Sequence, residues 1–166
     1  MDHYSRMVTT TCPLEGPNAG WVTTALELAF ARYGAPKHIV TDQEGVFISE
    51  VFAEFLWRWH VKQRFGAVGQ HGSIAVTERV IWTLKHEWLN RVALIRGIDH
   101  LRGLLDDFGV YYSTYRGHTT LGGAPPAVIY RGEQWSKPAK TAKTLPVAIE
   151  RRVFAETRVT AYRLAA

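Results

Sequence analysis

The stretch GQHGSIAVTERVIWTLKHEWL, residues 69–89, is a glycine-spaced loop that leads directly into an amphipathic segment. At about 100° per residue, one stripe of a helix expected over residues 73–91 is formed by Ile74, Thr77, Ile81, Leu84 and Trp88. Glu78 and Lys85 differ by only about 20° on this wheel and lie on one flank of the stripe. The pattern therefore places a carboxylate and an ammonium beside the buried face, where a purely structural helix gains nothing obvious.

The segments around this helix alternate between extended and helical patterns. Strands are expected at residues 4–12, 36–42 and 61–65, and helices at 21–34, 47–60 and 98–116. Gly34 is the expected end of the first helix, since glycine commonly follows the last helical residue. A strand followed by alternating helices and short apolar strands indicates an α/β sheet with helices on its faces.

The composition is that of a chain with one core. Of 166 residues 46% are hydrophobic, which is enough for one sizeable core and too little for two full domains. The apolar runs are far shorter than a membrane span, and no signal peptide precedes the first acidic residue. Cys12 is the only cysteine, so a reducing compartment is the default. We therefore expect a cytoplasmic protein that does not enter a membrane.

Positive charge gathers at the C-terminal end. Residues 131–166 hold eight Lys or Arg and three Glu, a net of +5 that equals the net charge of the whole chain. A basic tail on a neutral body suits the phosphates of nucleic acid, although a solvated tail without a partner has the same charge. Residues 133–144 are expected to be a basic linker, and residues 145–166 a basic tail that could form a β-hairpin.

Three carboxylates are candidates for a metal site. Asp42 ends a short strand, where ligands often gather in open α/β sheets, and Asp2 would lie on the first strand. If both pointed into one cleft with Glu78, each like-charged pair at about 4 Å would cost about 4 kcal/mol at an effective dielectric of about 20. Such a cluster must protonate, move apart or hold a cation, and Mg²⁺ prefers hard oxygen ligands. Two such ions could clamp the oxygens of an in-line phosphoryl transfer.

The chain resembles the catalytic core of the DDE transposases and retroviral-type integrases, particularly the branch found in bacterial insertion sequences. The matching stretches are DHYSR at 2–6, TDQEGVF at 41–47, GSIAVTERVIWTLKHE at 72–87 and YRGHTTLGGAPPAVIYRG at 115–132. Thirty-five residues separate Asp42 from Glu78, the spacing for which this branch is named. The resemblance covers about residues 2–132 and implies an RNase H-like fold, with a mixed sheet flanked by helices.

The resemblance also implies a site. Asp2, Asp42 and Glu78 would be the catalytic Mg²⁺ ligands, with Mn²⁺ able to substitute. Lys85 matches a position that contacts DNA near the site, where it would reach a phosphate as a point charge, and Arg79 is a plausible further phosphate contact. Residues 66–72 match the mobile active-site loop of the family.

The same resemblance sets the expected organisation and partners. Residues 1–132 would be the catalytic core, acting on DNA as a homo-oligomer in the nucleoid, with no membrane and no small-molecule substrate. Because only Met1 precedes Asp2, we expect a first strand truncated at the N-terminus and no upstream DNA-end-binding domain. Glu44 departs from the pattern, in which glycine is usual, and adds a negative charge near the proposed metals.

Two hypotheses stay open from the sequence. The first is a metal-dependent DNA transesterase core, in which water or a 3′-hydroxyl attacks a phosphodiester. The second is a non-catalytic remnant that at most binds DNA through its basic tail, and an RNase H-like nuclease without strand transfer is a distant third. Without the resemblance, Asp42 is typical of a turn-capping residue, and Glu78 and Lys85 are typical of surface charges.

Overall fold

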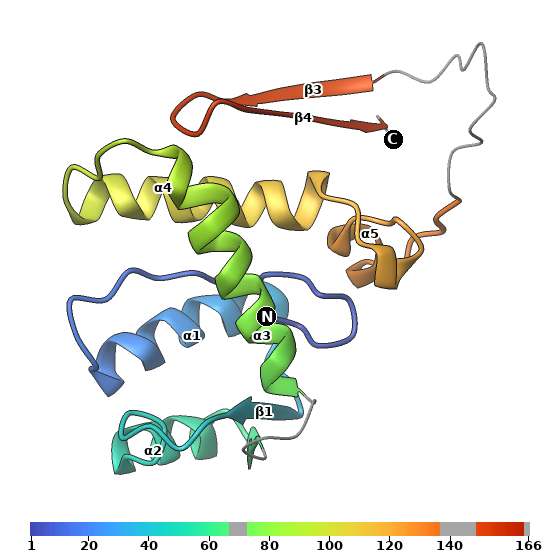
Figure 1. Cartoon of the computed structure of the whole chain (residues 1–166). Coiled ribbons are helices and arrows are strands. Elements are labelled where there is room, and N and C mark those ends of the chain that lie inside the picture. The colour runs from blue at the N-terminus through green and yellow to red at the C-terminus, as the bar shows by residue number, and fades with distance from the viewer. Residues whose placement is uncertain (67–72, 137–148, 165–166) are drawn as a thin grey trace. The chain divides into compact units, whose positions relative to one another are not determined.

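The computed structural model describes residues 1–66, 73–136 and 149–164. The chain forms two compact units (Figure 1). One is Thr9–Thr83, and the other combines Met1–Val8 with Leu84–Ala166. Within the described ranges, no helix has the length and apolar character needed to cross a membrane.

The described residues of the Thr9–Thr83 unit form two parallel strands and three helices. Its elements are α1 (Ala19–Tyr33), β1 (His38–Thr41), α2 (Glu50–Arg58), β2 (Lys62–Phe65) and α3 (Ser73–Thr83). The strands pair in parallel with His38 opposite Lys62, and α2 forms the crossover between them. The core between the helices and strands consists of Phe30, Phe52, Phe55, Leu56 and Val61.

Local signals fix the ends of these helices. The Asn18 side chain accepts a hydrogen bond from the Trp21 N–H at 3.2 Å, so α1 begins at Ala19. Gly34 has a φ of 84° and ends α1, with its N–H bonded to the Phe30 carbonyl. Ser49 caps α2 by accepting a hydrogen bond from the Phe52 N–H. The expected helices at 21–34 and 47–60 and the strands at 36–42 and 61–65 are therefore confirmed, with small shifts of their ends.

The other unit is mainly helical and carries a hairpin. Its elements are η1 (Leu84–Trp88, a π-helix), η2 (Leu89–Arg91), α4 (Ile98–Val110), η3 (Tyr111–Tyr115, a π-helix), η4 (Thr119–Leu121), α5 (Pro126–Tyr130), β3 (Ile149–Phe154) and β4 (Val159–Leu164). The strands β3 and β4 pair antiparallel, as the sequence allowed. Figure 1 shows this hairpin lying along the helix formed by α4 and η3.

Aromatic rings form the core of this second unit. Trp88 is 1% exposed, its ring stacks on Tyr111 at 5.0 Å, and it meets Phe108 and Phe154 edge to face. Its Nε1–H donates to the Leu104 carbonyl at 2.9 Å. The cluster holds the π-helix η1 against η3 and the hairpin.

The prediction of a strand at residues 4–12 is wrong, because the structure forms no strand there. The Asp2 carboxylate instead accepts hydrogen bonds from the Ser5 N–H and hydroxyl at 2.7 and 2.6 Å, which closes a turn. The Val8 N–H donates to the Ser113 hydroxyl at 3.1 Å. Since these contacts occupy polar groups that a strand would offer to a neighbour, the segment stays outside both sheets. The described strands form two separate two-stranded sheets rather than one mixed sheet.

Candidate active site

Asp42 and Glu78 lie on neighbouring elements of the Thr9–Thr83 unit. Asp42 directly follows β1, and Glu78 lies in the middle of α3, which contacts β1. Both side chains are exposed to solvent. The fold therefore brings together the two elements that carry these carboxylates and leaves both carboxylates accessible.

Gly66 permits the close approach of α3. Its N–H donates to the Thr41 carbonyl at 2.9 Å, which places it beside the end of β1. A Cβ atom at this position would overlap the Ile74 side chain and lie 3.7 Å from Val40 Cγ1. The missing side chain lets Ile74, on the first turn of α3, pack over the ends of β1 and β2.

Asp42 also caps its own turn. Its Oδ1 accepts a hydrogen bond from the Glu44 N–H at 3.1 Å, as expected for a turn-capping aspartate. A carboxylate offers about four lone-pair sites, so one such bond leaves most of its capacity for a cation. The capping role and a ligand role are therefore compatible.

Two basic residues, Arg79 and Lys85, follow Glu78 in the chain. Arg79 lies over the Trp82 ring, with its Cζ 5.2 Å from the ring centre, so the guanidinium is held along the helix surface. Lys85 is exposed on η1, which belongs to the other unit. Among the residues that the structure describes, neither Glu78 nor Lys85 has a hydrogen-bond or ion-pair partner, so the ordinary surface-pair interpretation finds no contact to support it.

Asp2 belongs to the Met1–Val8 segment of the second unit and is partly buried. Its Oδ2 is engaged by Ser5, and its N–H donates to the Met7 carbonyl at 2.8 Å. Across residues 1–66, 73–136 and 149–164, no three His, Cys, Asp or Glu side chains gather as a metal site. The donors still fit Mg²⁺ chemically, because this ion is commonly held by one or two carboxylates and several waters.

Sequence reasoning missed the role of the segment after η3. Arg116 pairs with Glu87, with its Nη2 3.3 Å from Oε1 and Nη1 in close contact with Oε2, and this pair fastens the end of η3 to η1. His118 packs edge-on against Tyr112, with ring centres 4.6 Å apart. The available signal was the Arg-x-His pair, Arg116 and His118, within the quoted stretch 115–132. Through Arg116 this segment is bonded to η1, the helix that carries Lys85.

Comparison with known proteins places these features in a family. Two models of the integrase core domain match residues 1–71 and 60–126, which contain all five candidate site residues. A search of curated protein sequences gave no match.

Solved structures give the same fold. The HTLV-2 integrase catalytic core domain in complex with magnesium is 20% identical, with a TM-score of 0.57 over 76% of this chain and 78% of that one. The catalytic core domain of BIV integrase is 19% identical, with a TM-score of 0.63 over 78% and 81%. A simian T-cell lymphotropic virus intasome in complex with PP2A regulatory subunit B56 gamma is 12% identical, with a TM-score of 0.60 over 90% and 54%. At these identities the likeness establishes the fold, which is RNase H-like.

Proposed function

The chain is a catalytic core of the integrase and transposase family, whose members act in DNA integration and transposition. From this premise we propose that it catalyses the metal-dependent transfer of DNA strands. Water or a 3′-hydroxyl would attack a phosphodiester bond of DNA. A cytoplasmic, nucleoid-associated location goes with this proposal.

The observation that carries the proposal is the contact between α3 and β1. It sets Glu78 and Asp42 on adjoining elements, with both carboxylates open to solvent and thirty-five residues between them. Asp42 and Glu78 would hold Mg²⁺ or Mn²⁺, with Asp2 as the third ligand. The chemistry that a divalent ion supplies at such a site is stabilisation of charge on the phosphoryl oxygens.

Other residues of the chain would orient the DNA. Lys85 presents a flexible point charge suited to a phosphate near the carboxylates. Arg79 lies over the Trp82 ring on the surface of α3, and its guanidinium offers forked donors that suit a phosphate. Gly66 has a structural role, because its missing side chain leaves room for Ile74 of α3 beside the end of β1.

Calorimetric titration with Mn²⁺, carried to millimolar metal, tests the proposal. The parent chain should bind, and Asp42→Asn and Glu78→Gln should each lose binding, because each removes a charged oxygen donor. Glu54→Gln is the matched control, since Glu54 is an exposed carboxylate of the same unit on α2. Folded parent chain that takes up no metal would contradict the proposal, as would equal losses in Glu54→Gln.

The second candidate is a chain that binds DNA without catalysing strand transfer. It is favoured by the use of Asp2 and Asp42 as turn-capping groups. The same titration separates the two candidates. DNA binding together with a blank metal titration would support the second.

A further inference from the structure

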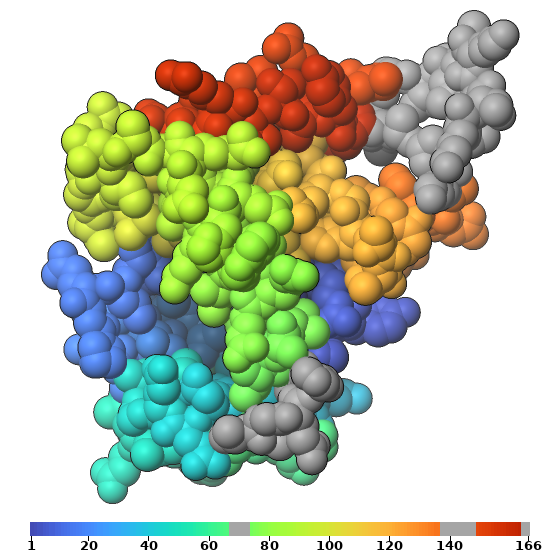
Figure 2. Space-filling view, in the orientation of Figure 1, coloured from blue at the N-terminus to red at the C-terminus, as the bar shows by residue number. Residues whose placement is uncertain are grey.

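A basic pocket of about 510 Å³ lies in the second unit, away from any residue assigned above. One wall is the segment 91–96, which follows η2, and the other is the turn 155–158, which joins β3 to β4. Figure 2 shows the hairpin packed against the residues that precede α4, and residues of both segments line the pocket. Its charged lining is Arg91, Arg96, Arg158 and Glu156.

The lining has an excess of positive charge. Arg96 is the arginine whose charge is balanced, because its Nη2 lies 3.4 Å from Oε1 of Glu156. Arg91 uses only its Nε–H, which donates to the Glu87 carbonyl at 2.7 Å. In the part of the chain that the structure describes, neither Arg91 nor Arg158 has an acidic partner. Two guanidinium groups at one pocket thus remain free to bind an anion.

Arg158 occupies an unusual backbone conformation. Its φ is 56°, in the left-handed region that favours glycine or asparagine. The turn keeps a long cationic side chain there although a small residue would suit the backbone better. Backbone strain of this kind at a pocket is a ground for inferring function.

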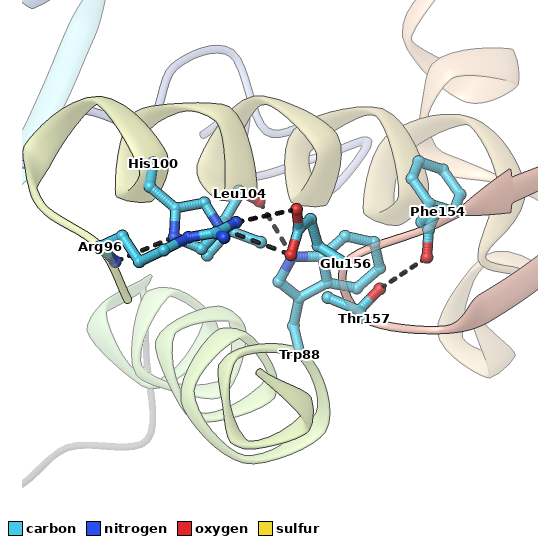
Figure 3. A network of polar contacts seen from close by, with 7 residues as sticks. All are labelled: Trp88, Arg96, His100, Leu104, Phe154, Glu156 and Thr157. Carbon is cyan, nitrogen blue, oxygen red and sulfur yellow. Dashed lines mark hydrogen bonds and ion pairs between the residues drawn. The ribbon is translucent and has the colours of Figure 1, made fainter. Parts of the chain in front are cut away.

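The walls of the pocket are fixed by contacts within the unit. Figure 3 shows the network: the Arg96 N–H donates to His100 Nδ1 at 3.0 Å, and His100 Nε2 lies 3.6 Å from Glu156 Oε2. On the hairpin side, Thr157 is buried and its hydroxyl donates to the Phe154 carbonyl at 3.5 Å. These contacts fix the backbone of both walls before any ligand arrives.

We propose that this pocket binds a phosphate group of the DNA backbone between Arg91 and Arg158. Guanidinium groups present forked donors that match phosphate oxygens, and Arg91 and Arg158 are the two that Glu156 does not pair with. The choice of DNA as the source of the phosphate rests on the proposed function. Free inorganic phosphate offers similar oxygens but lacks the row of neighbouring charges along a DNA strand.

The test uses the full chain and a labelled duplex, with affinity followed by fluorescence anisotropy over about 50–300 mM salt. Log affinity falls as log salt rises. In the double variant Arg91→Gln with Arg158→Gly, this fall should be less steep, by about 0.9 in slope for each DNA phosphate that the variant no longer neutralises. The glycine suits the left-handed turn, so the hairpin should remain folded. The matched control is Arg32→Gln with Arg58→Gln, which removes two exposed arginines from the other unit.

A second arm identifies the source of the phosphate. Titration of inorganic phosphate and of DNA into ¹⁵N-labelled chain should shift the side-chain signals of Arg91 and Arg158, with DNA acting at far lower concentration. Shifts with inorganic phosphate but none with DNA would overturn the assignment to DNA. No shift with either titrant would overturn the proposal that the pocket binds a phosphate group. A parent-like salt slope in the pocket variant overturns this inference while leaving the Mn²⁺ titration, and thus the proposed function, unaffected.

Discussion

The protonation of His118 makes the stability of the fold depend on pH. Burial lowers its pKa below the usual value, and the charges of Arg116 and Arg6 lower it further, although the Tyr112 carbonyl favours the protonated ring. The ring is held in place by the edge contact with Tyr112. The neutral imidazole is therefore the form that the folded chain prefers.

The expected consequence is a loss of stability in mild acid. As pH falls through about 6.5, the unfolded chain binds a proton at His118 before the folded chain does. The stabilisation is therefore complete above that pH and is lost as pH falls from it towards the lower folded pKa. His118→Gln should lose less free energy of unfolding than the parent between about pH 7.5 and pH 5.5, as measured by urea titration at each pH. Equal losses in the two chains would show that His118 does not carry the effect.

At the scale of elements, local signals were predictable and long-range packing was not. Asn18 and Gly34 fix α1 by bonds within a few residues, so periodicity and capping locate that helix from the sequence. The β-branched run at 4–12 has the composition of a strand, but the Asp2–Ser5 turn and the Ser113 contact take its polar groups. Composition cannot reveal such a contact, because its partner lies more than a hundred residues away in the chain.

The π-helices η1 and η3 show the same limit of sequence-based prediction. Residues 73–91 and 98–116 have the spacing of ordinary helices, yet the backbone widens at η1 and η3. At these places Trp88 stacks on Tyr111, so the wider turns coincide with the aromatic cluster of the second unit. For the candidate site, spacing and family motifs singled out Asp42 and Glu78, and the structure was needed to show that α3 contacts β1, which Asp42 follows. The turn-capping bonds of Asp2 and Asp42 required the structure.

Trp88 is the residue on which this cluster should depend most. Trp88→Ala should lower the free energy of unfolding by about 3–5 kcal/mol, because it empties a site that is almost wholly buried. Trp88→Phe keeps a ring but loses the hydrogen bond to the Leu104 carbonyl, and should cost about 1–3 kcal/mol. Chemical denaturation followed by circular dichroism measures both.

Trp57→Phe is the control for these variants, since Trp57 is 75% exposed on α2 and should change stability by no more than about 0.5 kcal/mol. If Trp88→Phe were as harmless as Trp57→Phe, the aromatic cluster would not be the centre of the second unit.

At the scale of the whole molecule, the two units differ in net charge. The Thr9–Thr83 unit holds 6 basic and 7 acidic residues, a net of −1, and the other unit holds 14 basic and 8 acidic residues, a net of +6. The carboxylates Asp42 and Glu78 lie in the first of these units, and Lys85 and the basic pocket lie in the second. One unit is thus suited to cations and the other to the phosphates of DNA.

This division predicts assembly on DNA rather than in free solution. At low salt the +6 units of two chains repel each other, and a DNA duplex would remove that repulsion by neutralising them. Sedimentation velocity at about 50 mM salt should find single free chains, and two or more chains on a duplex of about 30 base pairs. A duplex of about 8 base pairs is the control, because its length leaves room for about one chain. Saturation of the longer duplex by one chain would contradict the prediction. It would show that removing the repulsion between the positively charged units does not let a second chain bind beside the first.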